Sequence, residues 1–121
     1  MGFVHHSNYL KYFEAARLEW LDKLGISYKK MEENGILLPV IYTEIKYLFP
    51  LKFDDTFVVK VGIDKIPQSK LILNYQINSH ENKKICFGNI HLAFLNSKNH
   101  KPVRAPDKLT IVFKKIMNYK F

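Results

Sequence analysis

One helical segment followed by four alternating segments constrains the fold of this chain most strongly. Apolar side chains recur at helical spacing between about Asn8 and Leu24, which predicts a helix there with one buried face. The side chains expected on that face are Leu10, Phe13, Trp20, Leu21 and Leu24. Gly25 is expected to end this helix as a left-handed cap, and a shorter helix is predicted over Ser27 to Glu33.

Hydrophobic and polar residues alternate in the later segments, which is typical of antiparallel strands with one buried face. The segments are Val40–Phe49, Thr56–Ile66, Leu71–Asn78 and Ile85–Leu95. In the first segment, the side chains predicted to share one face are Ile41, Ile45, Tyr47 and Phe49. A short terminal helix is expected over Pro106 to Ile116. The chain is therefore predicted to be α+β, with a long antiparallel sheet curving around one helix.

The length and the cysteine content limit the number of domains and the cellular compartment that can be expected. A chain of 121 residues builds one core, so residues 1–121 are expected to form a single domain. No apolar run approaches the roughly 20 residues that span a bilayer. Cys86 is the single cysteine, which excludes an intrachain disulfide and predicts a reducing, cytoplasmic location. Because Cys86 lies in a strand-like segment, we expect a buried structural thiol and not a nucleophile.

The first 21 residues, MGFVHHSNYLKYFEAARLEWL, carry the most specific motif. The pattern Gly-x-x-x-His-x-Asn-Tyr-Leu-x-Tyr-Phe-Glu-x-Ala-Arg-x-Glu resembles the opening of hot-dog-fold acyl-CoA thioesterases of the 4-hydroxybenzoyl-CoA thioesterase type. The resemblance implies a hot-dog fold, in which the sheet wraps a central helix, and hydrolysis of an acyl-CoA to a free acid and coenzyme A. It also implies a homodimer or homotetramer with the site between subunits. An acyl carrier protein thioester remains an open alternative substrate.

The same resemblance implies two features that this sequence lacks. Family members carry an aspartate three residues before the glycine that corresponds to Gly2, and a strand before the helix. Both would fall upstream of Met1, so the domain is expected to be truncated at its N-terminus, without its catalytic carboxylate. Two explanations stay open: either Met1 is an internal methionine taken as a start, or the chain is short and has become a weak or inactive thioester binder.

The candidate catalytic residues are His6, Asn8, Tyr9 and Glu14. The resemblance implies that the backbone N–H of Tyr9 polarises the thioester carbonyl, and the N-terminus of a helix favours developing negative charge. His6 matches the motif histidine and could position water or act as the base. Asn8 could cap the helix or contact substrate. Glu14 would be the substitute base, although its spacing also allows an ion pair with Arg17.

The net charge of +8 leaves the nature of the basic surface open. Arg17 and Arg104 are the only arginines among the 19 basic residues, whereas specific phosphate or base recognition favours arginine. Nucleic-acid binding is therefore not predicted. The lysines form either a generally basic surface or one that binds the phosphates of coenzyme A. A non-catalytic thioester-binding or basic interaction module is the alternative function, and no motif predicts a metal or a cofactor.

Overall fold

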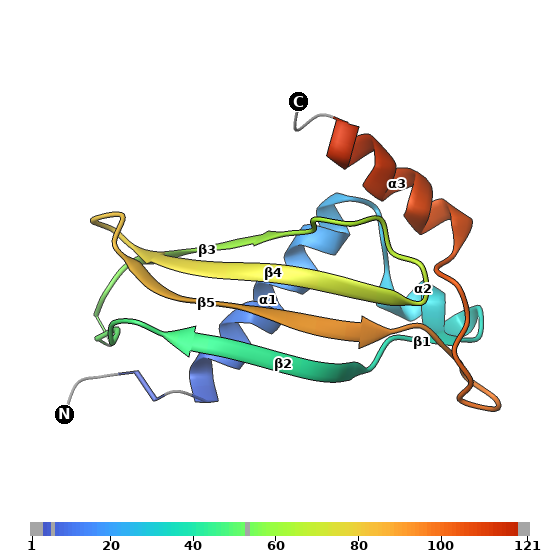
Figure 1. Cartoon of the computed structure of the whole chain (residues 1–121), viewed down its shortest axis with the longest axis horizontal. Helices are drawn as coiled ribbons and strands as arrows, with labels where there is room; N and C mark the ends of the chain where they lie inside the picture. Colours follow the sequence, from blue (N-terminus) through green and yellow to red (C-terminus); the bar gives the residue numbers. More distant parts are fainter. Residues whose placement is uncertain (1–3, 6, 53, 119–121) are drawn as a thin grey trace.

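The computed structural model describes residues 4–5, 7–52 and 54–118 as an antiparallel sheet with helices against it (Figure 1). The helices are α1 (Ser7–Lys23), α2 (Tyr28–Glu33) and α3 (Asp107–Asn118). The strands are β1 (Ile36–Leu37), β2 (Val40–Tyr47), β3 (Phe57–Gly62), β4 (Lys70–Ser79), β5 (Lys84–Ala93) and β6 (Leu95–Asn96). The predicted α+β class, the three helices and the four long strands are confirmed to within a few residues at most boundaries.

The main sheet has the strand order β2-β5-β4-β3, and every neighbouring pair is antiparallel. The central strands β4 and β5 each pair on two sides and are the longest strands, with 10 residues each. The two edge strands are β2 and β3, while β1 pairs separately with β6. In Figure 1, α1 crosses one face of this sheet obliquely. No helix among the described residues is long and apolar enough to cross a membrane.

Capping residues explain where α1 ends and where α2 begins. Gly25 adopts a φ of +77°, the left-handed conformation that suits glycine, and its N–H donates to the carbonyl of Asp22 at 2.9 Å. The predicted glycine cap of α1 is therefore confirmed. Ser27 then caps α2, because its hydroxyl oxygen accepts a hydrogen bond from the N–H of Lys30 at 3.3 Å.

The buried face of α1 includes most of the predicted side chains, because Phe13 and Leu21 are buried and Trp20 and Leu24 pack partly buried against the core. Leu10 is 43% exposed, so its assignment to the core was wrong. The buried residues recur every four positions, and they are Tyr9, Phe13, Arg17 and Leu21. Phe13 stacks on Tyr75 of β4 with 4.5 Å between ring centroids, which fixes this face against the centre of the sheet. The predicted apolar face is therefore confirmed apart from Leu10, whose place is taken by Tyr9, and the face includes the cation of Arg17.

The predicted buried face of β2 is also wrong. Ile41, Tyr47 and Phe49 are each nearly half exposed, and only Ile45 of that set packs partly against the core. A β-bulge between Val40 and Tyr42 interrupts the alternation. β2 lies at the edge of the sheet, and most of its apolar side chains are left about half exposed in this single chain.

A close approach between β2 and β5 depends on Gly88. A Cβ atom at this position would overlap the carbonyl oxygen of Glu44 and lie 3.0 Å from the Cα of Ile45. Gly88 pairs with Ile45 in the register of the two strands. The absence of a side chain at residue 88 therefore allows β2 to pair closely with the rest of the sheet.

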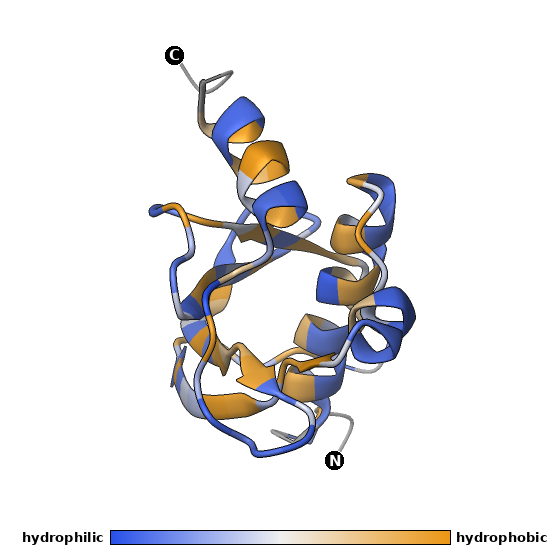
Figure 2. Cartoon of the chain, turned by 90° about the vertical axis from the view of Figure 1, so that its right-hand side faces the viewer, coloured by the Kyte–Doolittle hydropathy of each residue, from blue (hydrophilic) through white to orange (hydrophobic). Residues whose placement is uncertain are grey.

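The terminal helix α3 closes one end of the core. Leu109 and Phe113 are buried, and Phe113 stacks on Trp20 of α1 with 5.6 Å between centroids. Figure 2 shows hydrophobic and hydrophilic residues alternating along α3, the helix nearest the C-terminus. The short amphipathic helix predicted from the sequence is thus confirmed.

Candidate functional site

The N-terminal end of α1 is attached to the segment that follows β2. The N–H of Val4 donates to the carbonyl of Leu51 at 2.7 Å, and the N–H of Leu51 donates to the phenol oxygen of Tyr9 at 3.2 Å. The N–H of Asn8 donates to the carbonyl of His5 at 2.9 Å and so closes the first turn. These bonds fix the start of α1 against residues 50–51.

An open pocket of about 310 Å³ lies at this junction and is here called the Tyr9 pocket. Its lining residues are Val4, Tyr9, Tyr47, Leu48, Phe49 and Pro50. The rings of Tyr9 and Tyr47 meet edge to face, with 5.3 Å between centroids. The lining is almost wholly apolar or aromatic, so the pocket suits an acyl chain or the uncharged arm of a thioester.

The start of α1 adds electrostatic character to the Tyr9 pocket. Tyr9 is the third residue of α1, and the first-turn N–H groups of a helix have no carbonyl acceptor four residues earlier within the helix. No acidic residue lies in this first turn to offset the positive end of the helix dipole. Burial raises the pKa of the Tyr9 phenol, so this phenol stays protonated at neutral pH and cannot serve as a base. The arrangement suits stabilisation of a carbonyl oxygen as it gains charge.

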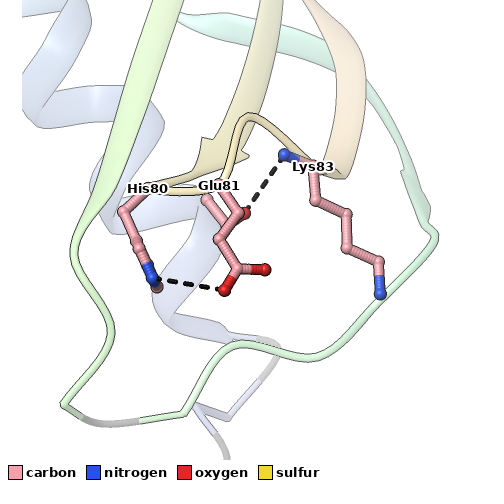
Figure 3. Close-up of polar contacts among 4 residues, drawn as sticks. His80, Glu81 and Lys83 are labelled. Carbon is pink, nitrogen blue, oxygen red and sulfur yellow. Dashed lines mark hydrogen bonds and ion pairs between the residues drawn. The ribbon is translucent and has the colours of Figure 1, made fainter.

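A lysine from the β4–β5 hairpin borders the pocket. The ammonium of Lys83 lies 3.6 Å from the centroid of the Phe49 ring, in cation–π contact with a pocket residue. The hairpin is held by the N–H of Lys83, which donates to the Ser79 hydroxyl at 3.1 Å (Figure 3). Figure 3 also shows the His80–Glu81 pair, 3.6 Å apart, whose exposure makes its contribution to stability small. The pocket is therefore apolar inside and positively charged at this border.

The structure brings together only some of the predicted site residues. Tyr9 lines the pocket, and Asn8 is half-buried beside it in the first turn. Glu14 is exposed, and its position five residues after Tyr9 places it about 140° around the helix axis. His6 lies outside the described residues. The catalytic roles of these four residues therefore remain predictions.

Arg17 does not form the surface ion pair with Glu14 that its spacing allows. Its side chain is only 8% exposed, and its guanidinium lies 5.9 Å from the ring centroid of Tyr28. Burial raises the pKa of nearby Tyr75 to about 12, despite the opposing effect of the Arg17 charge. Arg17 is thus a residue of the core, about two turns further along α1 than Tyr9.

Cys86 is fully buried in β5, as predicted, and burial raises the pKa of its thiol to about 11. We expect the native protein not to react with a disulfide reagent such as dithionitrobenzoate at pH 8, and to release one equivalent of chromophore when urea unfolds it. Rapid reaction of one thiol in the native state would contradict the buried position.

Within the part of the chain that the structure describes, no three His, Cys, Asp or Glu side chains are placed to hold a metal ion.

A family model decides the identity of the fold. The model of the thioesterase-like superfamily matches residues 1–113, which include both α1 and the whole sheet. The chain belongs to this superfamily. The match confirms the resemblance drawn from the first helix and, with the antiparallel sheet around α1, the hot-dog fold.

Individual relatives and a solved structure agree with this family assignment. A putative esterase of Aquifex aeolicus is 31% identical over 113 residues, which cover 93% of this chain and 86% of the relative. The putative acyl-CoA thioesterase YneP of Bacillus subtilis is 38% identical over 77 residues, covering 64% of this chain and 56% of that protein. The structure of a DHNA-CoA thioesterase from Staphylococcus aureus superposes with a TM-score of 0.89 at 27% identity, covering 99% of this chain and 83% of that one. The enzyme class is therefore thioester hydrolase.

Proposed function

We propose that this thioesterase-like protein hydrolyses an acyl-CoA to a carboxylic acid and coenzyme A, with the thioester carbonyl at the start of α1. The observation that carries the proposal is the position of Tyr9. Tyr9 lines an apolar pocket with its side chain, and it also supplies a backbone N–H in the first turn of the helix. The acyl-CoA class is supported by relatives such as YneP. An acyl carrier protein as donor and a cytoplasmic location remain predictions.

The proposed reaction needs a base as well as an oxyanion donor. A water oxygen attacks the carbonyl carbon, the base takes the water proton, and the Tyr9 N–H donates to the developing oxyanion. The C–S bond then breaks, and the thiolate of coenzyme A recovers a proton. We propose His6 as the base, with Asn8 holding the substrate. Glu14 faces away from the Tyr9 pocket of its own chain, so it can serve only if a second copy brings another pocket to it.

We further propose that two copies associate through β2. This strand lies at the edge of the sheet, where its strand neighbour is β5, and it exposes apolar side chains that a monomer rarely leaves together. Those of β2 and the two residues after it are Val40, Ile41, Tyr42, Tyr47, Leu48 and Phe49. Pairing through β2 would place a second chain beside the Tyr9 pocket, because Tyr47, Leu48 and Phe49 belong to both surfaces.

The direct test measures thiol release from octanoyl-CoA and benzoyl-CoA, with binding of the same compounds measured in parallel. Turnover that saturates with substrate is expected. Saturable binding without thiol release would overturn the hydrolytic proposal and favour the non-catalytic thioester-binding alternative. Absence of both would remove acyl-CoA as the ligand. The buried thiol of Cys86 keeps the protein itself from contributing to the signal.

Lys83 is expected to recognise the phosphates of coenzyme A, because its ammonium lies at the border of the pocket. The change Lys83→Glu should raise KM for an acyl-CoA by about tenfold, the value of one charge-assisted hydrogen bond. The same variant should leave KM unchanged for the corresponding acyl-N-acetylcysteamine, which lacks the nucleotide. Lys98 is an exposed lysine outside the Tyr9 pocket, so the change Lys98→Glu is the matched control. Equal KM changes for both substrates would contradict this role.

A further inference from the structure

A second cavity lies at the opposite end of α1, between the α1–α2 turn, α2, β1 and the start of α3. Its volume is about 220 Å³, and it shares no lining residue with the Tyr9 pocket. Its apolar lining consists of Leu24, Ile26, Met31, Ile36, Pro106, Leu109 and Val112. Because Leu24 follows Tyr9 by 15 residues, the two sites are separated by about 22 Å along the helix axis.

The polar side chains around this cavity are two lysines and two neutral groups. They are Ser27, Lys30, Asn34 and Lys108, and among the residues that the structure describes no acidic side chain lines the cavity. The Ser27 oxygen already accepts the hydrogen bond from Lys30 N–H, so its hydroxyl proton remains to be donated. Asp107, which neighbours the cavity in sequence, instead lines an adjoining groove with Arg104 and Lys114. A mainly apolar lining that includes two exposed lysines fits a ligand with an apolar body and an anionic head.

We propose that this cavity binds a small amphipathic carboxylic acid, with its carboxylate between Lys30 and Lys108. A dry apolar cavity of about 150 Å³ accommodates benzene, so the cavity described here suits an acid of roughly eight carbon atoms. A neutral hydrocarbon would gain nothing from the charges of the two exposed lysines, and a cation would meet like charge. The binding claim stands independently of the proposed activity.

Trp20 offers a reporter for this binding. It is the single tryptophan of the chain, and it stacks on Phe113, the residue next to Val112 of the cavity. We expect octanoate to change the Trp20 fluorescence with a saturable, one-site dependence. The eight-carbon alcohol 1-octanol and the cation octylammonium match the apolar body but lack the negative charge. Both should bind at least about tenfold more weakly than octanoate, the equivalent of one lost charge-assisted contact.

Paired variants locate the site. Lys108→Glu should weaken octanoate binding by about tenfold or more, whereas Lys114→Glu on the same helix lines only the neighbouring groove and should change it less than twofold. Val112→Phe should abolish saturable binding by filling the cavity. Ile111→Phe changes a neighbouring residue of α3 that is 54% exposed and does not line the cavity, so binding should persist. Circular dichroism establishes that each variant is folded.

Three results would overturn the proposal. They are no saturable octanoate binding, 1-octanol binding as tightly as octanoate, and equal loss in Lys108→Glu and Lys114→Glu. None of these measurements involves thioester turnover, so failure of this site and failure of the proposed hydrolysis are separate outcomes.

Discussion

Replacing Tyr9 by proline is expected to lower kcat for thioester hydrolysis by about 10²–10³ relative to replacing it by alanine. Both variants remove the phenol and its hydrogen bond from the Leu51 N–H. Only proline also removes the backbone N–H that we assign to the oxyanion, and loss of one such donor costs about this much in other hydrolases. Proline is tolerated at the start of a helix because first-turn N–H groups have no intrahelical acceptor.

The comparison needs both variants folded, because Tyr9 is 3% exposed and contributes to the core. Thermal denaturation followed by circular dichroism gives the temperature at which each remains native, and kcat is then compared below the lower of the two values. Tyr9→Phe completes the set, since it keeps the N–H and the ring and loses only the hydroxyl. Equal kcat values for the proline and alanine variants would show that another donor holds the oxyanion.

Gly88→Ala is expected to destabilise the fold by about 2–3 kcal/mol, because an added methyl group would meet backbone and not a side chain that can rotate away. The overlap with the Glu44 carbonyl requires β2 to move away from β5, which would weaken the hydrogen bonds on both sides of Ile45. Loss of close pairing at this point would also disturb Tyr47 and with it the wall of the Tyr9 pocket.

Gly62 provides the matched control for this substitution. It lies in β3, and a Cβ there would meet nothing within 4 Å. Gly62→Ala should therefore change the free energy of unfolding by less than about 1 kcal/mol, with a small gain possible from the stiffer unfolded chain. Urea denaturation measures both variants. A cost for Gly88→Ala no larger than that for Gly62→Ala would show that β2 adjusts freely.

The elements of the fold could be predicted because period and turn chemistry are local properties. The faces could not always be predicted, since they depend on what packs against each element. Leu10 and Tyr9 differ by one position on α1, and only the position of the sheet decides which is buried. Arg17 entered the core against its usual preference because it occupies the same stripe as Phe13. Most apolar side chains of β2 are left about half exposed at the edge of the sheet.

The residues of the candidate site also fall into those that the sequence could predict and those that it could not. Tyr9 could be found from the sequence because its motif is contiguous. Phe49 and Lys83 were missed, since 34 residues separate them and only the pairing of strands brings the β4–β5 hairpin beside the end of β2. The available signal was the Lys83–Lys84 pair within a turn, which does not by itself distinguish a ligand contact from a solvated hairpin.

The exposed edge of β2 also has a consequence for how the protein behaves in dilute solution. Because the apolar side chains of Val40–Tyr47 gain cover only from a second chain under the proposed pairing, association adds to the free energy of the folded state by mass action. The melting temperature then rises with protein concentration. Dilution would loosen β2 first and, because Tyr47 also lines the Tyr9 pocket, would lower the activity of each remaining molecule.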